Sequence, residues 1–263
     1  SSQKSIEELI KYVEEYHENE PITINENNNF NDKYNLNIPR LVVVGTQSSG
    51  KSSLVNRIIN LDLLPTGNNM VTRSPIYIEL KNCESNEIPC INISYVKDGT
   101  ESLFFTEKLV FIKKQDIIEK INELSLLMTG NDFAITSNPI IIRIHQNNVI
   151  PLFIIDLPGL VTIAKTEKGQ KESIITDIQN LVKTQLRIQN TYCICAIQSK
   201  MDLETDIGLA IVKEIQKEKP DLKVFSVLTK PDLIDKRYKK DFDEKIGGNL
   251  IEKSISTEMG FYV

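Results

Sequence analysis

The sequence predicts an α/β protein with a mixed, mostly parallel central sheet flanked by helices. Short β-branched and apolar runs alternate along the chain with longer segments of helical periodicity, the order typical of a sheet covered by helices. A glycine-rich loop joins the first such run to the first helical segment. The 263 residues are 40% hydrophobic and 25% charged, enough for one large domain with a substantial core.

Strands are expected where a short apolar run is bounded by turn residues. These runs lie near 41–45, 75–80, 90–96, 139–145, 151–156, 191–197 and 223–229. Helices are expected between them, most clearly at 51–60, 115–128, 171–189, 205–218 and 237–257. Their apolar stripes are interpreted as faces that pack on the sheet.

The two ends of the chain differ from this core. Residues 1–18 are expected to hold an amphipathic helix, because Ile6, Leu9, Ile10 and Val13 recur at helical spacing. Residues 19–38 are rich in Asn and predict a linker loop. We therefore expect the domain to occupy 39–263, with the chain stopping as it enters a further strand near Gly260.

Composition excludes several classes of protein. No run approaches the roughly 18 to 20 apolar residues of a membrane span, and the N-terminus lacks a signal-peptide pattern, so we expect an intracellular protein. A net charge of −5 argues against a general nucleic-acid binder. With only two histidines in the chain, the four cysteines are interpreted as reduced thiols (Cys83, Cys90, Cys193 and Cys195).

The strongest motif is a phosphate-binding P-loop. Residues 41–53 read LVVVGTQSSGKSS, which contains the pattern Gly45-x-x-x-x-Gly50-Lys51-Ser52 between a strand and a helix. Glycines let backbone N–H groups approach an oligophosphate, and the helix N-terminus adds partial positive charge. Lys51 is expected on the β- and γ-phosphates and the Ser52 hydroxyl on Mg²⁺. A chance Gly/Ser-rich turn is the alternative, which the flanking elements disfavour.

A second motif, PLFIIDLPGL at 151–160, places an acid at the end of a buried strand and a glycine three residues later. In a P-loop protein, Asp156 can reach the Mg²⁺ shell and Gly159 can offer its N–H to a γ-phosphate. Taken alone, Asp156 would be interpreted as a helix N-cap. Because the motif follows a P-loop in the chain, the magnesium role is preferred over the helix N-cap.

The third motif is Thr229-Lys230-x-Asp232, at the end of another expected strand. A carboxylate accepts hydrogen bonds from N1–H and the N2 amine of guanine, whereas adenine offers neither donor. Asp232 therefore favours GTP, and the Lys230 stem can lie along the purine. By itself TKPD is a common turn. It indicates guanine binding only because it follows the P-loop and the DLPG motif in the chain.

Together with LPTGNNMVTRSPIYIEL at 64–80, these motifs resemble the dynamin superfamily of large GTPases. The family patterns GxQSxGKSS, LPxGxxxVTRxP, DLPG and TKxD all occur here in order. The resemblance covers essentially the whole chain and implies a P-loop GTPase domain. It also implies that the N-terminal helix packs with helices from beyond the domain, and that the chain is truncated at its C-terminus.

The resemblance further implies roles for individual residues. The family assigns the attacking water to Thr72, a bridging water to Gln47, and compensating charge to Na⁺ or K⁺ held by Ser48 and the loop from Gly67 to Asn69. This chain has Asn68-Asn69 where the family usually has Ser-Gly, so it departs from the family in the loop whose carbonyls are expected to hold the ion. Asp202 is implied to reach a second G domain, although without the family it would be interpreted as an ordinary solvated acid.

The predicted site residues fall into two sets. The nucleotide-binding set is Gly45, Ser48, Ser49, Gly50, Lys51, Ser52, Ser53, Arg73, Gly159, Thr229, Lys230 and Asp232. The Mg²⁺ set is Ser52, Thr72 and Asp156.

The expected function is GTP hydrolysis to GDP and phosphate, stimulated when G domains dimerise. The resemblance implies a cytoplasmic parent protein that remodels organelle or vesicle membranes, with membrane contact only through parts outside this chain. Organelle division and vesicle scission rank ahead of antiviral assembly. Two alternatives stay open: a scaffold that binds GTP but hydrolyses it poorly, and an ATP-using P-loop enzyme.

Overall fold

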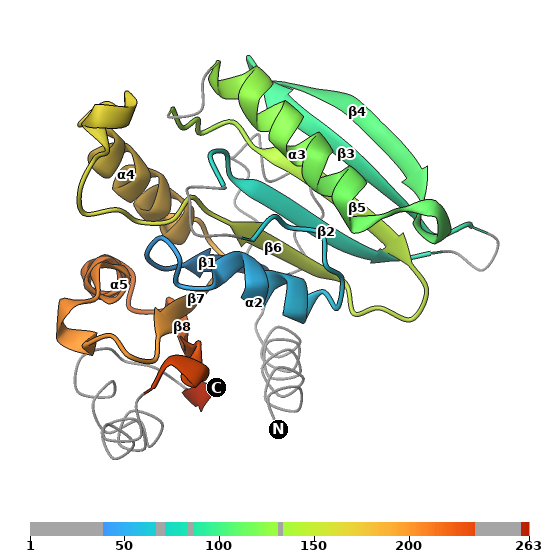
Figure 1. Ribbon diagram of the computed structural model, residues 1–263. Coiled ribbons are helices and arrows are strands. Elements are labelled where there is room, and N and C mark those ends of the chain that lie inside the picture. The colour runs from blue at the N-terminus through green and yellow to red at the C-terminus, as the bar shows by residue number, and fades with distance from the viewer. Residues whose placement is uncertain (1–38, 67–71, 84–86, 131–133, 235–258, 263) are drawn as a thin grey trace.

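The computed structural model describes residues 39–66, 72–83, 87–130, 134–234 and 259–262. Within these residues the chain forms a nine-stranded sheet with the order β4-β3-β5-β2-β6-β1-β7-β8-β9 (Figure 1). The strands are β1 (Arg40–Val44), β2 (Ile76–Asn82), β3 (Cys90–Lys97), β4 (Thr100–Lys108), β5 (Ile140–Gln146), β6 (Leu152–Asp156), β7 (Thr191–Gln198), β8 (Lys223–Thr229) and β9 (Met259–Tyr262).

Strand direction places the carboxyl ends of the central strands at one edge. β1 is parallel to both β6 and β7, and β8 continues this parallel set from β7 to β9. β2 runs antiparallel to β6, so Ile76 at the start of β2 pairs with Asp156 at the end of β6. The segment that precedes β2 therefore reaches the edge where β1, β6, β7 and β8 end.

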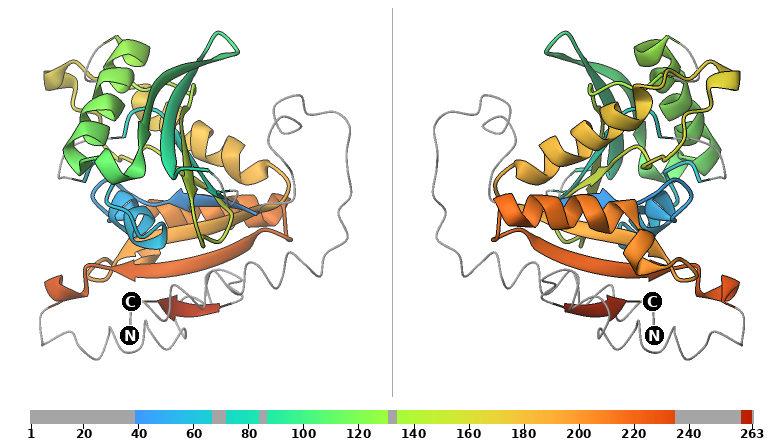
Figure 2. Two further views of the ribbon diagram at one scale, coloured as in Figure 1. Left: turned by 90° about the vertical axis from the view of Figure 1, so that its right-hand side faces the viewer. Right: turned by 90° about the vertical axis from the view of Figure 1, so that its left-hand side faces the viewer.

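Two helices cover each face of the sheet. α2 (Lys51–Ile58) and α3 (Lys114–Thr129) share a core with Leu41 and Val43 of β1. α4 (Ile174–Arg187) and α5 (Ile207–Glu218) share the opposite core with Val42 and Val44. Because successive side chains of a strand alternate in direction, β1 is buried on both faces. Figure 2 shows α3 (green) and α4 (gold) on opposite sides of the sheet.

These observations confirm the predicted α/β class. Each predicted strand is present, and the four described helices match predicted segments, although α4 begins at Ile174 and α5 at Ile207 rather than at 171 and 205. No strand was predicted at 100–108, so β4 is a correction. This edge strand mixes exposed and half-buried residues, and its only apolar run is the short Leu103-Phe104-Phe105. The predicted segments 1–18, 19–38 and 237–257 lie outside the described residues, and the domain division stays a prediction.

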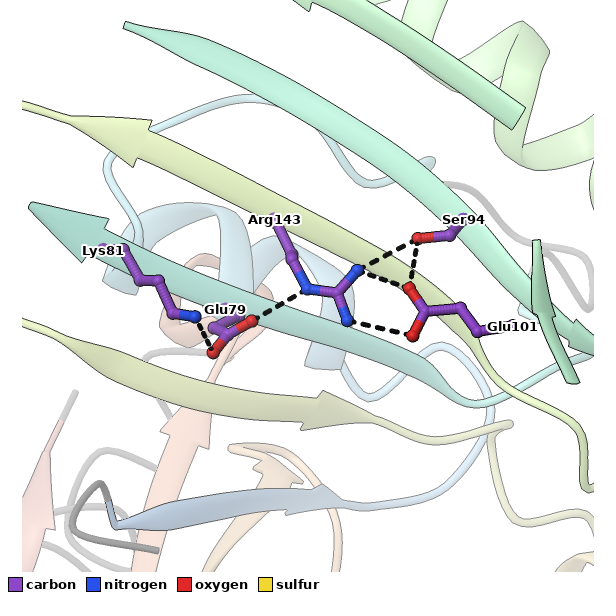
Figure 3. Close-up of polar contacts among 5 residues, drawn as sticks. All are labelled: Glu79, Lys81, Ser94, Glu101 and Arg143. Carbon is purple, nitrogen blue, oxygen red and sulfur yellow. Dashed lines mark hydrogen bonds and ion pairs between the residues drawn. The ribbon is translucent and has the colours of Figure 1, made fainter. Parts of the chain in front are cut away.

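A polar cluster crosses the outer strands (Figure 3). The Arg143 guanidinium on β5 donates from Nε to Glu79 on β2 at 3.0 Å and from its terminal nitrogens to Glu101 on β4 at 2.5 and 3.2 Å. Ser94 accepts from Arg143 at 3.1 Å and donates to Glu101 at 2.8 Å, and Lys81 pairs with Glu79 at 2.7 Å. These charge pairs tie β4 to the sheet, together with Phe104 and Phe105 of β4, which pack against the hydrophobic core.

The structure gives all four cysteines as free thiols, with Cys193 and Cys195 buried in β7 and Cys83 and Cys90 half-buried. Among the residues that the structure describes, no helix combines the length and apolar character that a membrane span requires.

Candidate functional site

The P-loop forms the tight turn between β1 and α2. Gly50 at the N-cap of α2 has φ +88°, and Ser48 also has a positive φ of 63°. No side chain from the described part of the chain caps the helix, so the amides of its first turn stay available to an anion. The turn is closed by the Ser49 amide, which donates to the Thr46 carbonyl at 3.1 Å.

Two close backbone approaches require glycine. A Cβ on Gly45 would lie 2.4 Å from the Ala196 carbonyl oxygen, and a Cβ on Gly159 would lie 2.8 Å from the Cα of Gln47. The loop after β6 thus runs directly against the P-loop. Two backbone bonds fasten it there, from the Gln47 amide to the Leu160 carbonyl at 2.9 Å and from the Leu160 amide to the Gly45 carbonyl at 3.1 Å.

Lys51 is a buried cation beside this loop, with 7% of its surface exposed. Its ammonium donates to the Thr46 carbonyl at 2.9 Å and lies 3.0 Å from the position that a Cβ on Gly159 would take. Burial lowers the pKa of Lys51, and the charges of Asp156 and Asp206 partly offset this effect. A buried ammonium between the P-loop and the loop after β6 suits an anionic ligand.

Three oxygen-bearing side chains from separate segments meet at the end of β6. The Ser52 hydroxyl donates to Asp156 Oδ2 at 2.8 Å, and the Thr72 hydroxyl lies 3.5 Å from the same oxygen. Asp156 is fully buried, and burial raises its pKa despite the opposing effects of Lys51, Ser52 and Thr72. Asp156 Oδ1 has no hydrogen-bond partner among the described residues. Hydroxyl and carboxylate oxygens are the ligands that Mg²⁺ prefers, so this set fits the ion.

The Gln47 side chain adds a second unsatisfied group. Its Nε2 is buried and has no hydrogen-bond partner within the described ranges. A buried amide donor without a partner is costly, which suggests a ligand at this position. Next to it, Leu160 is 2% exposed and packs in the core with α4 and α5, so its side chain cannot orient water.

β8, which leads into the Thr229-Lys230-x-Asp232 motif, is hydrogen-bonded to the P-loop. Thr229 at the end of β8 donates from its hydroxyl to the Ser49 carbonyl at 2.5 Å, and its Cβ would lie 3.4 Å from a Cβ on Gly50. Lys230 follows with φ 56°, and Asp232 is exposed in the short helix η4 (Pro231–Leu233). The geometry brings Thr229 to the P-loop and leaves the Asp232 carboxylate accessible to solvent.

Several other residues predicted for the site have no described contact with the P-loop or Asp156 among the described residues. Asp202 is exposed and caps η3 (Leu203–Thr205) by accepting from the Glu204 amide at 3.0 Å. Ser53 is exposed in the first turn of α2, and Arg73 is half-buried with its carbonyl accepting from the Thr136 amide at 3.1 Å. Gly67 and Asn69, predicted to hold a monovalent cation, lie outside the described residues. The roles assigned to all these residues stay predictions.

The structure adds two residues that sequence reasoning missed. Gln198 at the end of β7 donates to the Ser48 carbonyl at 3.1 Å. Asp206, 3% exposed, caps α5 by accepting from the Leu209 amide at 2.9 Å, and Gly208 beside it would place a Cβ 3.5 Å from the Cα of Gly45. A cap signal was readable at Asp206, whereas no local pattern pointed to Gln198.

The sheet and these converging loops define a P-loop nucleotide-binding domain with a magnesium-type ligand set. A model of the dynamin family matches residues 41–231. The chain therefore belongs to the dynamin family, whose G domain is a GTPase, and the predicted family is confirmed.

Individual relatives support this membership. The chain is 34% identical over 199 residues to phragmoplastin DRP1A of Arabidopsis thaliana, which covers 76% of this chain and 30% of that protein. It is 30% identical over 225 residues to Dynamin-A of Dictyostelium discoideum, covering 84% of this chain and 24% of that protein. For the interferon-induced GTP-binding protein Mx1 of Ictalurus punctatus, the identity is 32% over 201 residues, covering 76% and 30%. The chain thus spans less than a third of these relatives.

Proposed function

We propose that this domain binds GTP with Mg²⁺ and hydrolyses it to GDP and phosphate. The observation that carries the proposal is the meeting of Ser52, Thr72 and Asp156 beside the buried Lys51. Ser52, Thr72 and Asp156 would hold Mg²⁺, which supplies positive charge to the β- and γ-phosphates. Lys51 and the first-turn amides of α2 bind the same phosphates and fix their orientation.

Hydrolysis also needs an oriented water molecule. The water oxygen forms a bond to the γ-phosphorus while the bond from that phosphorus to the β–γ bridging oxygen breaks, and the water proton passes to phosphate. Leu160 cannot position this water because its side chain is in the core. We assign the task to Thr72, which lies beside Asp156, and to the buried and unsatisfied Gln47 amide. Ser48 would hold a Na⁺ or K⁺ ion that compensates developing negative charge.

Guanine selection is assigned to Asp232, with Lys230 along the purine. The left-handed conformation of Lys230 turns the chain directly after β8, so Asp232 follows at the edge where the phosphate loops lie. Loss of a hydrogen bond to a charged group costs roughly 1.5 to 3 kcal/mol, so adenine would bind about tenfold to a hundredfold more weakly. Competition between ATP and a fluorescent guanine nucleotide tests this assignment; equal competition by ATP and GTP would indicate an ATP-using enzyme.

Dimerisation through the G domain, with Asp202 reaching the partner, is the proposed route of stimulation. The parent protein would use this cycle to remodel organelle or vesicle membranes. One relative, 33% identical over 210 residues, is named vacuolar protein sorting-associated protein 1 in Schizosaccharomyces pombe, and this name supports a role in sorting to an organelle. Membrane contact would come from regions outside this chain.

Turnover measured against protein concentration tests the proposal. GTP hydrolysis should rise per molecule as concentration increases, in KCl or NaCl more than in LiCl at the same ionic strength. Lys51→Ala serves as the inactive control. Binding of GTP without turnover at any concentration would instead support the scaffold alternative.

A further inference from the structure

Gln198 joins the P-loop to the segment that follows β7. Its Nε2 lies 3.1 Å from the Ser48 carbonyl oxygen. A carbonyl can only accept, so the amide nitrogen must face it, and this fixes the orientation of the glutamine side chain. The bond joins two residues that are 150 positions apart in the chain.

Ser48 needs such a restraint because of its backbone. Its φ of 63° lies in the left-handed region, which is disfavoured for a residue with a Cβ. Its neighbour Ser49 is held from β8, where Thr229 donates to the Ser49 carbonyl at 2.5 Å. Two consecutive carbonyls of the P-loop therefore accept hydrogen bonds from neighbouring strands. Ser48 accepts from Gln198 of β7, and Ser49 accepts from Thr229 of β8.

The segment from Gln198 to Gly208 contacts the P-loop at both ends. At its start, Gln198 binds Ser48, and its own carbonyl accepts from the Met201 amide at 2.9 Å. At its end, Gly208 would place a Cβ 3.5 Å from the Cα of Gly45. The exposed Asp202 lies between these two anchor points.

We propose that Gln198 is a positioning residue that holds the P-loop at Ser48 and couples it to the segment carrying Asp202. This inference rests on the proposed function for its effect on turnover. The contact reaches Ser48 rather than Lys51 or the first turn of α2. Gln198 therefore shapes the part of the loop that acts during hydrolysis, while the main phosphate contacts stay in place.

The test compares Gln198→Met with Gln198→Lys. Both side chains are unbranched and of similar length, but only lysine retains a donor for the Ser48 carbonyl. Gln189→Met is the matched control, because Gln189 is an exposed glutamine just before β7, at its other end. Two properties are measured: hydrogen exchange of the Gln47 and Ser49 amides without nucleotide, and kcat together with the Kd for GDP.

In Gln198→Met we expect amide exchange to rise and kcat to fall by about threefold to tenfold, the effect of one hydrogen bond. The Kd for GDP should change by less than about twofold, and the melting temperature should match that of Gln189→Met. Gln198→Lys should restore both exchange protection and kcat. A purely structural role would instead change melting temperature, Kd and kcat together.

Failure of this inference can be distinguished from failure of the proposed function. Unchanged exchange and kcat in Gln198→Met, or equal losses in the Met and Lys variants, would overturn the positioning role even if the wild type hydrolyses GTP. If the wild type shows no turnover, hydrolysis is wrong and amide exchange alone decides: faster exchange in Gln198→Met supports the restraint of Ser48, and unchanged exchange overturns it.

Discussion

The Ser52 hydroxyl donates a 2.8 Å hydrogen bond to the buried carboxylate of Asp156, which lies 104 residues further along the chain. This contact joins the first turn of α2 to the end of β6. It brings the phosphate-binding loop and the acid of the second motif to one point, with Thr72 entering from a third segment.

Replacing Asp156 with asparagine should remove the magnesium dependence of GTP binding. The substitution keeps the shape of the side chain but removes the charge that would attract the ion. GTP titrations in Mg²⁺ and in EDTA should give similar affinities for Asp156→Asn, whereas the wild type should bind more tightly with Mg²⁺. Asp177→Asn, in the first turn of α4, is the control. A wild-type response to Mg²⁺ in Asp156→Asn would contradict the ligand assignment.

Lys51→Ala should weaken nucleotide binding by about a hundredfold or more, because it removes charge-assisted hydrogen bonds to two phosphates. Calorimetric titration with GDP and GTP measures the loss. Lys217→Ala, an exposed lysine in the last turn of α5, should bind like the wild type. An affinity of Lys51→Ala within about tenfold of the wild type would remove this lysine from the phosphate site.

Thr72→Ala should leave nucleotide affinity within a few-fold of wild type while turnover falls by about 10² or more, the usual effect of losing one positioned transition-state contact. Thr72→Ser retains the hydroxyl and should restore most of the rate. Single-turnover hydrolysis at saturating enzyme separates chemistry from binding. Persistent hydrolysis in Thr72→Ala would mean that the hydroxyl is not needed.

Arg143→Met should destabilise the fold by about 2 to 3 kcal/mol, less than for a fully buried pair because the cluster is partly exposed. The guanidinium bridges Glu79 and Glu101, whose side chains are 5% and 17% exposed. Adding Glu79→Gln and Glu101→Gln should recover part of the loss, since these substitutions remove the two carboxylates that Arg143 bridges, although Lys81 also pairs with Glu79. Urea unfolding of the single and triple variants measures both effects. Equal destabilisation by the two would show that packing, not charge, ties β4 to the sheet.

The buried acid Asp206 should make stability depend on pH. Burial raises its pKa above the ordinary 3.8, so the native state binds the proton more tightly than the unfolded state. Stability contributed by this group therefore falls as pH rises from about 3.8 through the raised native pKa. Asp206→Asn keeps an acceptor for the Leu209 amide and should flatten this fall.

Chemical unfolding of nucleotide-free protein across acidic and neutral pH measures the difference between Asp206→Asn and wild type. The variant should gain stability relative to wild type as pH rises, and the gain should vanish below the ordinary pKa. A constant difference at every pH would show that ionisation of Asp206 plays no part.

Local patterns predicted most elements of this fold. The apolar runs at 151–156 and 191–197 are strands because they are buried on both faces, and the stripe with Ile117 and Leu124 packs α3 on the sheet. The strand 100–108 has no such run. Its signal was the preceding Asp98-Gly99, both with positive φ, which is the two-residue turn typical of a hairpin.

The site was predictable only where a motif fixed residue types at a spacing. Lys51, Asp156 and Thr229 follow from such motifs. Gln198 could not be predicted, because its contact with Ser48 requires β7 to neighbour β1, and strand order depends on long-range packing. The reversal of β2, which delivers Thr72, depends on that packing too.

The antiparallel insertion of β2 beside β6 has a consequence for biogenesis. Thr72 and Asp156 are separated by 84 residues, so a growing polypeptide cannot bring these two side chains together until β6 has emerged and paired. Nucleotide bound at this site would then stabilise only chains whose central strands are correctly ordered. At a concentration a hundredfold above Kd, it would favour those chains by about 2.7 kcal/mol over misfolded competitors.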